Sequence, residues 1–114
     1  MKISELAKES NLSIDTIRYY QKVGLIKPKK EGFFRVYGEE DLEIISAIKV
    51  LKSTGMPLKN IKLIVEMETQ EVDFKLLKEI LDEHLEWIKK QETDIKTSKK
   101  IIAKALEKVN GKLI

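Results

Sequence analysis

The feature that most constrains the fold is a long segment, residues 72–109, which contains neither proline nor glycine. Apolar residues recur in it every seven positions, and this register holds for five heptads, which is typical of a coiled coil. One series, taken as heptad position a, consists of Phe74, Leu81, Ile88, Ile95, Ile102 and Val109. The matching d series consists of Leu77, His84, Gln91, Ser98 and Ala105. We predict one long dimerisation helix that uses these two series.

The length of this helix implies a partner helix. It extends roughly 55 Å at 1.5 Å per residue, too far to fold back on a head of about 70 residues. A parallel pair would stack His84 and Gln91 on their own copies. An antiparallel pair centred near residue 93 instead places large side chains opposite smaller or polar ones, such as Ile88 opposite Ser98, which evens the layer volumes. We therefore predict an antiparallel coiled coil, with registers one heptad away left open.

Two short helices joined by a tight turn are expected at the N-terminus. Ser4 can cap the first helix and Ser13 the second, while Ser10-Asn11 interrupts the pattern between them. Such a pair forms a helix-turn-helix unit. On the second helix, one face carries Ile14, Ile17 and Gln21, which can pack on a core. The other carries Asp15, Arg18, Tyr19 and Lys22.

The charge distribution favours a polyanionic partner for this region. An amphipathic helix with a polar outer face is usually no more than a solvated helix. Here, however, residues 18–37 hold six basic residues against one acidic residue, Glu31, in a chain whose net charge is +3. A patch of one sign on an otherwise mixed surface is what nucleic-acid binding requires.

The segment that follows the second helix is expected to form a two-stranded wing. Lys27-Pro28 ends the helical pattern. Glu31-Gly32 can supply the turn, with Ile26 before it and residues 34–36 after it as strand candidates. A helix-turn-helix followed by a basic, aromatic hairpin is the layout of a winged helix-turn-helix DNA-binding protein.

Two more helices complete the expected head. The third runs from about Glu39 to Thr54 and is stopped by Gly55. The fourth begins at Met56-Pro57 and ends at Thr69-Gln70. We therefore expect an all-α protein with a small β wing. Its parts are a winged helix-turn-helix domain at residues 1–70, a long C-terminal helix at 72–109 and a tail at 110–114.

Composition argues against several other classes of protein. The chain has no cysteine, which excludes disulfides and thiolate metal sites. Its only histidine is His84, and it has no phosphate-binding glycine loop or nucleophile motif, so we expect no enzyme, cofactor or metal. No stretch approaches the ~20 apolar residues of a membrane span, and the N-terminus lacks a signal-peptide core. We expect a cytoplasmic protein that does not bind membranes.

With these elements in place, the sequence resembles the MerR family of bacterial transcription regulators over about residues 1–70. Five ordered blocks carry the resemblance: residues 3–12, 16–20, 24–28, 34–37 and 51–61. Two departures are visible. Gln21 stands where the family usually has an acidic residue, and Phe33-Phe34 stands where Gly-Tyr is common. Neither removes a charge that DNA binding needs.

The resemblance implies a homodimer, joined through an antiparallel coiled coil, that binds a pseudo-palindromic site in double-stranded promoter DNA. The family typically binds an overlong spacer and distorts it so that RNA polymerase can engage. Family members usually carry an effector domain or metal-binding loop after the coiled coil. If the chain is full length, an inducer site is absent or lies beside the coiled coil. There Trp87 and Leu85 either line a groove or, the favoured alternative, pack on the partner's head. The inducer is unknown.

Site residues are carried over by position. Arg18 and Tyr19 would meet the major groove or its phosphates, while Arg35, Tyr37 and Lys59 would hold phosphates. Tyr20 lies between two helix faces and suits the core as well as it suits DNA. The expected DNA-binding set is Ser13, Thr16, Arg18, Tyr19, Tyr20, Lys22, Lys27, Arg35, Tyr37 and Lys59. The rival hypothesis is a coiled-coil interaction module whose head does not engage DNA.

Overall fold

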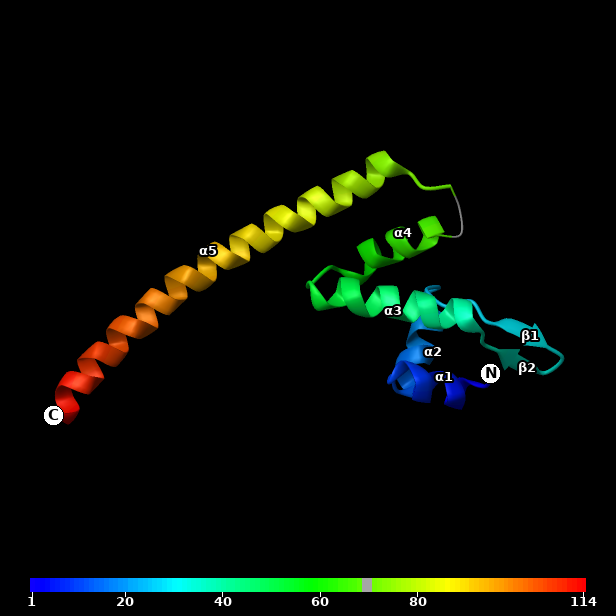
Figure 1. Cartoon of the computed structure of the whole chain (residues 1–114), viewed down its shortest axis with the longest axis horizontal. Coiled ribbons are helices and arrows are strands. Elements are labelled where there is room, and N and C mark those ends of the chain that lie inside the picture. Colours follow the sequence, from blue (N-terminus) through cyan, green and yellow to red (C-terminus); the bar gives the residue numbers. More distant parts are fainter. Residues whose placement is uncertain (69–70) are drawn as a thin grey trace. The chain divides into compact units, whose positions relative to one another are not determined.

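The computed structural model describes residues 1–68 and 71–114, so the helix end expected at Thr69-Gln70 lies outside the described residues. The chain forms two compact units, Met1–Asp73, which we call the head, and Phe74–Ile114. The elements in chain order are α1 (Ile3–Ser10), α2 (Ile14–Lys22), β1 (Lys29–Glu31), β2 (Phe34–Val36), α3 (Glu39–Ser53), α4 (Leu58–Glu68) and α5 (Phe74–Leu113), as Figure 1 shows. The expected all-α protein with a small β wing is confirmed.

The helix-turn-helix forms where the sequence predicts it. Asn11 ends α1 in the left-handed conformation with φ of 58°, which asparagine tolerates better than most residues. Ser13 then caps α2, because its side chain accepts a hydrogen bond of 3.1 Å from the backbone N–H of Thr16. The predicted cap at Ser4 is wrong. Helix α1 begins at Ile3, and its N-cap is Lys2, whose side chain makes no capping hydrogen bond.

The core of the head combines side chains from each helix and from the loop after α2. Helix α1 packs on α2 and α3, and α3 packs on α4. The fully buried large side chains are Leu6, Ile17, Ile26, Ile45, Ile48 and Ile61. Ile26 was expected in the first wing strand. It lies before β1 and is almost completely buried, so the apolar character that suggested a strand serves the core instead.

The wing is a short antiparallel hairpin closed by a two-residue turn. Lys29 pairs with Val36, Lys30 with Arg35, and Glu31 with Phe34. The turn is therefore Gly32-Phe33, one residue later than predicted, and Glu31 belongs to β1. Gly32 has φ of +60°, a conformation that glycine adopts without a steric penalty and that tight hairpin turns require.

The long C-terminal helix, α5, begins at Phe74 and continues to Leu113. It thus includes most of residues 110–114, where we expected a tail. A single glycine in a helix costs only about 1 kcal/mol, so Gly111 does not end so long a helix by itself. The side chains of Lys78 and Asp82, one turn apart, pair at 2.5 Å on its surface. This hydrogen bond raises the pKa of Lys78.

Candidate nucleic-acid interface

Helix α2 presents one face to the core and the opposite face to solvent. Ile17 and Tyr20 are buried, whereas Arg18, Tyr19 and Lys22 are not buried in the core. The predicted separation of faces is present at Ile17, with Tyr20 on the buried side, whereas Ile14, also expected to face the core, is 36% exposed. The outer face offers a guanidinium, a phenol and an ammonium group to a ligand.

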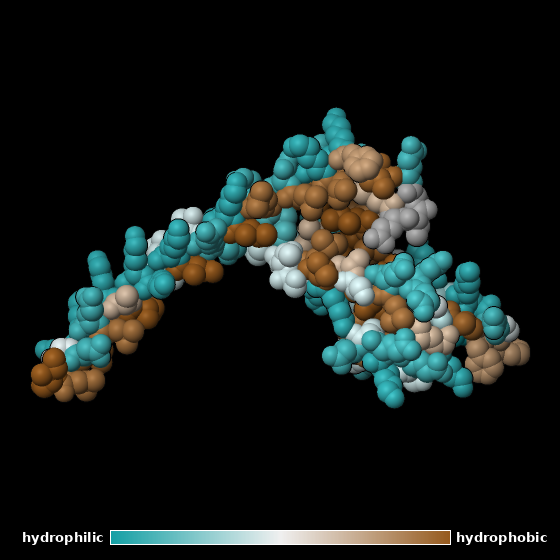
Figure 2. Space-filling model, in the orientation of Figure 1, coloured by the Kyte–Doolittle hydropathy of each residue, from teal (hydrophilic) through white to brown (hydrophobic). Residues whose placement is uncertain are grey.

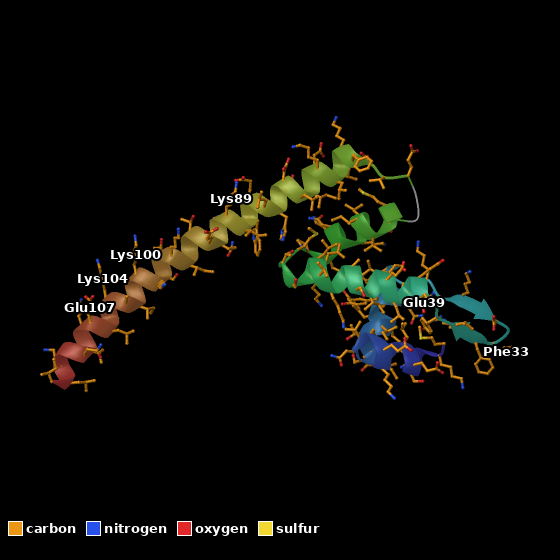
Figure 3. All side chains as sticks on the ribbon, viewed as in Figure 1. Phe33, Glu39, Lys89, Lys100, Lys104 and Glu107 are labelled. Atoms are coloured by element: carbon orange, nitrogen blue, oxygen red, sulfur yellow. The ribbon has the colours of Figure 1, made fainter. Side chains whose placement is uncertain are left out.

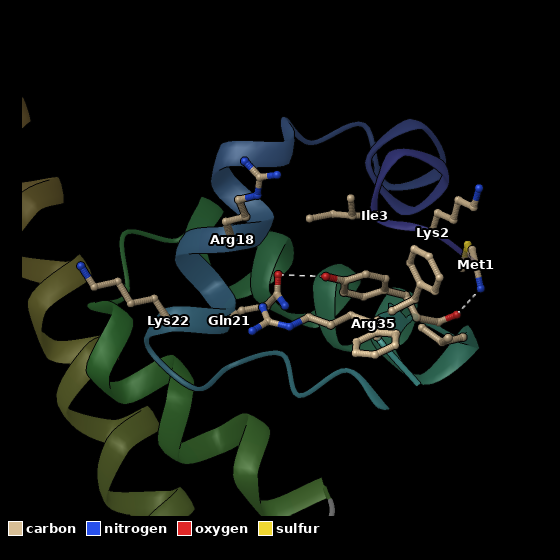
Figure 4. Close-up of a pocket in the computed structure, with 11 residues that line it drawn as sticks. Met1, Lys2, Ile3, Arg18, Gln21, Lys22 and Arg35 are labelled. Carbon is tan, nitrogen blue, oxygen red and sulfur yellow. Dashed lines mark hydrogen bonds between the residues drawn. The ribbon is translucent and has the colours of Figure 1, made fainter. Parts of the chain in front are cut away.

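The outer face of α2 and the wing enclose one hollow, which we call the basic concavity. Its volume is about 890 Å³. Arg18 and Lys22 line it from α2, Ile3 lines it from the start of α1, and Phe34 and Arg35 line it from the wing (Figure 4). Basic side chains from α2 and from the wing thus surround a partly apolar surface. Such a surface can bind an anionic backbone through charge while it covers apolar surface.

Hydrogen bonds fix the base of the wing to α2 and to the N-terminal segment. The hydroxyl of Tyr37 donates to Oε1 of Gln21 at 2.9 Å (Figure 4). The N-terminal ammonium of Met1 donates to the carbonyl oxygen of Tyr37, and the N–H of Tyr37 donates to the carbonyl oxygen of Met1. Because these bonds converge on one residue, Tyr37 sets the position of the wing relative to α2 and the N-terminal segment.

Two tyrosines of the expected DNA-binding set do not present an exposed surface. Tyr20 and Tyr37 are each only 3% exposed, Tyr20 in the core below α2 and Tyr37 with its hydroxyl bound to Gln21. A phosphate or base edge needs an accessible donor, so we correct both assignments. Tyr20 is a core residue, and Tyr37 positions the wing.

Other residues of the expected set occupy different places. Ser13 and Thr16 form the cap of α2, and their hydroxyl oxygens lie 2.8 Å apart. Lys59 lies on the first turn of α4. Lys27 lines a separate hollow of about 330 Å³ together with Glu40 and Asp41, so it faces acidic neighbours instead of the basic concavity.

The structure adds residues that sequence reasoning missed. Phe33 and Phe34 line the basic concavity, and both are exposed. Gln21, counted as a core-facing residue, also lines it, and its buried Nε2 has no hydrogen-bond partner among the described residues. One feature of the sequence could have pointed to Phe33 and Phe34 as site residues. They stand beside Gly32 at the hairpin turn, where an apolar side chain cannot pack into the core.

Helix α5 carries the expected dimerisation residues along one side. Leu81, Ile88, Ile95, Ile102 and Val109 of the a series are exposed, as is Phe74. Hydrophobic colour runs along one side of α5 in Figure 2, whereas Lys89, Lys100, Lys104 and Glu107 project from the other side in Figure 3. The residues of the d series differ from one another in exposure. Leu77 and Gln91 are intermediate in exposure, Ser98 and Ala105 are exposed, and the His84 ring stacks on Trp87 with centroids 5.3 Å apart.

Within residues 1–68 and 71–114, no three side chains of the metal-binding types gather into a possible cation site. None of the helices formed by these residues has the length and apolar character needed to cross a membrane.

A helix-turn-helix followed by a basic hairpin defines the winged helix-turn-helix class. The family model of the MerR HTH family regulatory proteins matches residues 1–68. The chain therefore belongs to the MerR family of helix-turn-helix transcription regulators.

Individual relatives agree with this assignment. The HTH-type transcriptional regulator ZntR homolog of Haemophilus influenzae is 36% identical over 88 residues, which are 75% of this chain and 65% of that protein. The chain thus matches less than two thirds of that relative. Among solved structures, the regulator PbrR691 of Ralstonia metallidurans CH34 in complex with lead(II) has a TM-score of 0.76 at 23% identity, and the alignment covers 90% of this chain and 81% of that one. At that identity the likeness shows the fold alone.

A second solved structure includes DNA. It is HiNmlR, described as a MerR family regulator lacking the sensor domain, bound to promoter DNA. Its TM-score is 0.62 at 26% identity, and the alignment covers 84% of this chain and 75% of that chain.

Proposed function

We propose that this regulator binds promoter DNA as a homodimer at a pseudo-palindromic site and changes transcription by distorting the spacer, so that RNA polymerase can engage. The observation that carries the proposal is the basic concavity, in which cations of α2 and the wing line one hollow. The promoter DNA bound to HiNmlR supports the same class of ligand.

Different residues have different tasks in this proposal. Arg18 and Tyr19 enter the major groove, where an arginine can donate two hydrogen bonds to the edge of a guanine. Lys22, Arg35 and Lys59 contact phosphates, which fix orientation without reading sequence. Lys27 contributes only long-range charge, because it lines a hollow with acidic residues.

From the exposure of α5 we infer a different dimer seam. Three exposed leucines follow members of the a series by four residues: Leu85, Leu106 and Leu113. With the a series they form an alternating 4–3 pattern from Leu81 to Leu113, which is the repeat of a coiled-coil seam. Glu92 and Lys99 fill the two middle positions of the new series. A shallow groove of about 440 Å³ lies on this stretch, lined by Ile88, Gln91, Glu92, Ile95, Lys96 and Lys99.

We propose that a second copy of this chain covers that seam in the antiparallel sense. A register centred near residue 97 pairs Leu85 with Val109 of the partner subunit and Ile88 with Leu106 of the partner subunit. Glu92 then lies one layer from Lys99 of the partner subunit, so the two charges within the seam are complementary. We propose this register in place of the one centred near residue 93, which relied on His84 and Ser98.

Footprinting on DNA upstream of the chain's own gene tests the proposed function. We expect a protected region with two-fold symmetry, and affinity that falls steeply between about 50 and 200 mM salt because several Lys and Arg contacts release counterions. Binding that is undetectable or insensitive to salt would instead favour the interaction module.

A further inference from the structure

The tip of the wing carries an aromatic side chain that nothing in the described part of the head covers. Phe33 is fully exposed, and Phe34 beside it is 74% exposed. Phe33 occupies the two-residue turn, and its side chain projects from the free end of the hairpin in Figure 3, where Figure 2 shows hydrophobic colour. The sequence has these two aromatics where the family resemblance leads one to expect Gly-Tyr. A glycine there would leave the tip without a side chain.

The charges around this tip identify the kind of partner. Lys30 and Arg35 are directly paired across the hairpin, so two positive side chains share one face of it. Like charges in that position destabilise a hairpin unless an anion neutralises them. Because Phe33 and Arg35 line the same concavity as Arg18, a polyanion bound to α2 also reaches the tip.

We propose that Phe33 is an apolar wedge that enters the minor groove of the bound duplex, beside the major groove occupied by α2. There the ring packs on deoxyribose and against the edge of one base step, while Lys30 and Arg35 contact the phosphates on either side. Apolar side chains inserted in this way partly unstack the step and kink the duplex. The inference rests on the proposed function, because it needs α2 to be bound to duplex DNA.

The wedge and the cations make different contributions to binding. Covering an aromatic ring contributes through the hydrophobic effect, which releases no counterions. The logarithm of the association constant for DNA falls linearly with the logarithm of the salt concentration. Removing a single phosphate interaction makes this slope shallower by about 0.9. The salt dependence of DNA affinity should therefore distinguish Phe33→Ser from Arg35→Ala, even if both substitutions weaken binding.

The test uses the full chain and a set of duplexes that span its footprinted region, each with 2-aminopurine at one position. With the parent, we expect fluorescence to rise at one step in each half-site. Phe33→Ser should abolish that rise and weaken binding about tenfold or more at an unchanged salt slope. Phe33→Leu, the matched apolar control, should retain most of both effects. Arg35→Ala removes one phosphate contact from each subunit of the dimer and should therefore reduce the steepness of the salt dependence by about 1.8.

Three outcomes would overturn the inference. If the parent binds no duplex, the proposed function fails and the wedge fails with it. If the parent binds DNA but Phe33→Ser matches it within about twofold in affinity and in 2-aminopurine signal, the wedge alone is excluded. If Phe33→Ser binds DNA normally but loses sedimentation with phosphatidylserine vesicles that the parent shows, the tip is a membrane contact. The Phe33 side chain is exposed, so circular dichroism should find every Phe33 variant folded.

Discussion

At the scale of single residues, Arg18 and Arg35 stand on different kinds of backbone, and the proposed function gives them different tasks. Arg18 stands on a helix whose opposite face, with Ile17, is buried in the core, so its position is rigid. Arg35 stands on a three-residue strand of a hairpin whose strands have no other sheet partner among the described residues. A rigid arginine suits the recognition of a base edge, and one on a hairpin suits a phosphate.

This difference predicts unequal effects of substitution. Arg18→Ala should weaken binding to the specific site by roughly 1–3 kcal/mol for each half-site, while it changes binding to unrelated DNA much less. Arg35→Ala should weaken binding to both DNAs by similar factors. Titration of each variant with the footprinted site and with a scrambled duplex measures both effects. Equal losses on the two DNAs for Arg18→Ala would show that it only positions the protein.

Tyr37 gives a second prediction at this scale, on stability. Tyr37→Phe removes the hydroxyl that donates to Gln21 and leaves the amide oxygen of Gln21 without that partner. The free energy of unfolding should fall by about 1–2 kcal/mol, because a partly buried polar group loses its partner. Tyr19→Phe makes the same chemical change at an exposed position and should leave stability unchanged. Urea denaturation of both variants tests the assignment, which fails if they unfold alike.

At the scale of elements, local signals predicted the head well. Ser13 as a cap and Gly55 as a helix stop act over a few residues, and both are visible in the sequence. The errors arose where tertiary contacts decide. Met1 is bonded to Tyr37, and the extended Lys2 beside it accepts the backbone N–H groups of Glu5 and Leu6 with its carbonyl oxygen, so the helix starts before Ser4. Ile26 was assigned to a strand because an apolar residue beside a turn signal suits a strand and a core equally.

The candidate site was less predictable than the fold, for a physical reason. Residue type and spacing placed Arg18, Tyr19 and Lys22 on one outer face, because helix geometry fixes that relation. No spacing rule places a wing residue against a helix. The burial of Tyr37 and the separation of Lys27 from Arg35 therefore depended on how the hairpin packs on the head.

The revised seam of α5 predicts a charge-swap experiment at the element scale. Glu92→Lys places like charges near Lys99 of the partner subunit, and Lys99→Glu does the same with the opposite sign. Each single variant should weaken the dimer by about 1 kcal/mol or more, and the double variant should recover most of that loss. Sedimentation equilibrium measures the three dissociation constants. Additive losses in the double variant would exclude this register.

At the scale of the whole molecule, the proposed dimer requires two heads to meet DNA together. Half-sites on one face of a duplex lie one helical turn or a multiple apart, so a dimer presents its two heads at a fixed separation. An antiparallel pair of α5 helices has a two-fold axis near the middle of its overlap, which matches the symmetry of a palindromic site. Specific binding by one head should therefore depend on the other.

Ile95 tests this dependence, because it lies close to the middle of the proposed seam and belongs to α5 alone. Ile95→Lys would place a charge directly opposite Lys99 of the partner subunit in this register, where like charges without a counter-charge are strongly unfavourable. We expect a folded head, a dimer that dissociates at micromolar concentration, and loss of binding to the palindromic site with weak binding to a single half-site retained. Lys100→Asp, on the opposite side of α5, is the matched control and should remain dimeric. A dimeric Ile95→Lys variant in the same sedimentation run would place the dimer contact elsewhere on the chain.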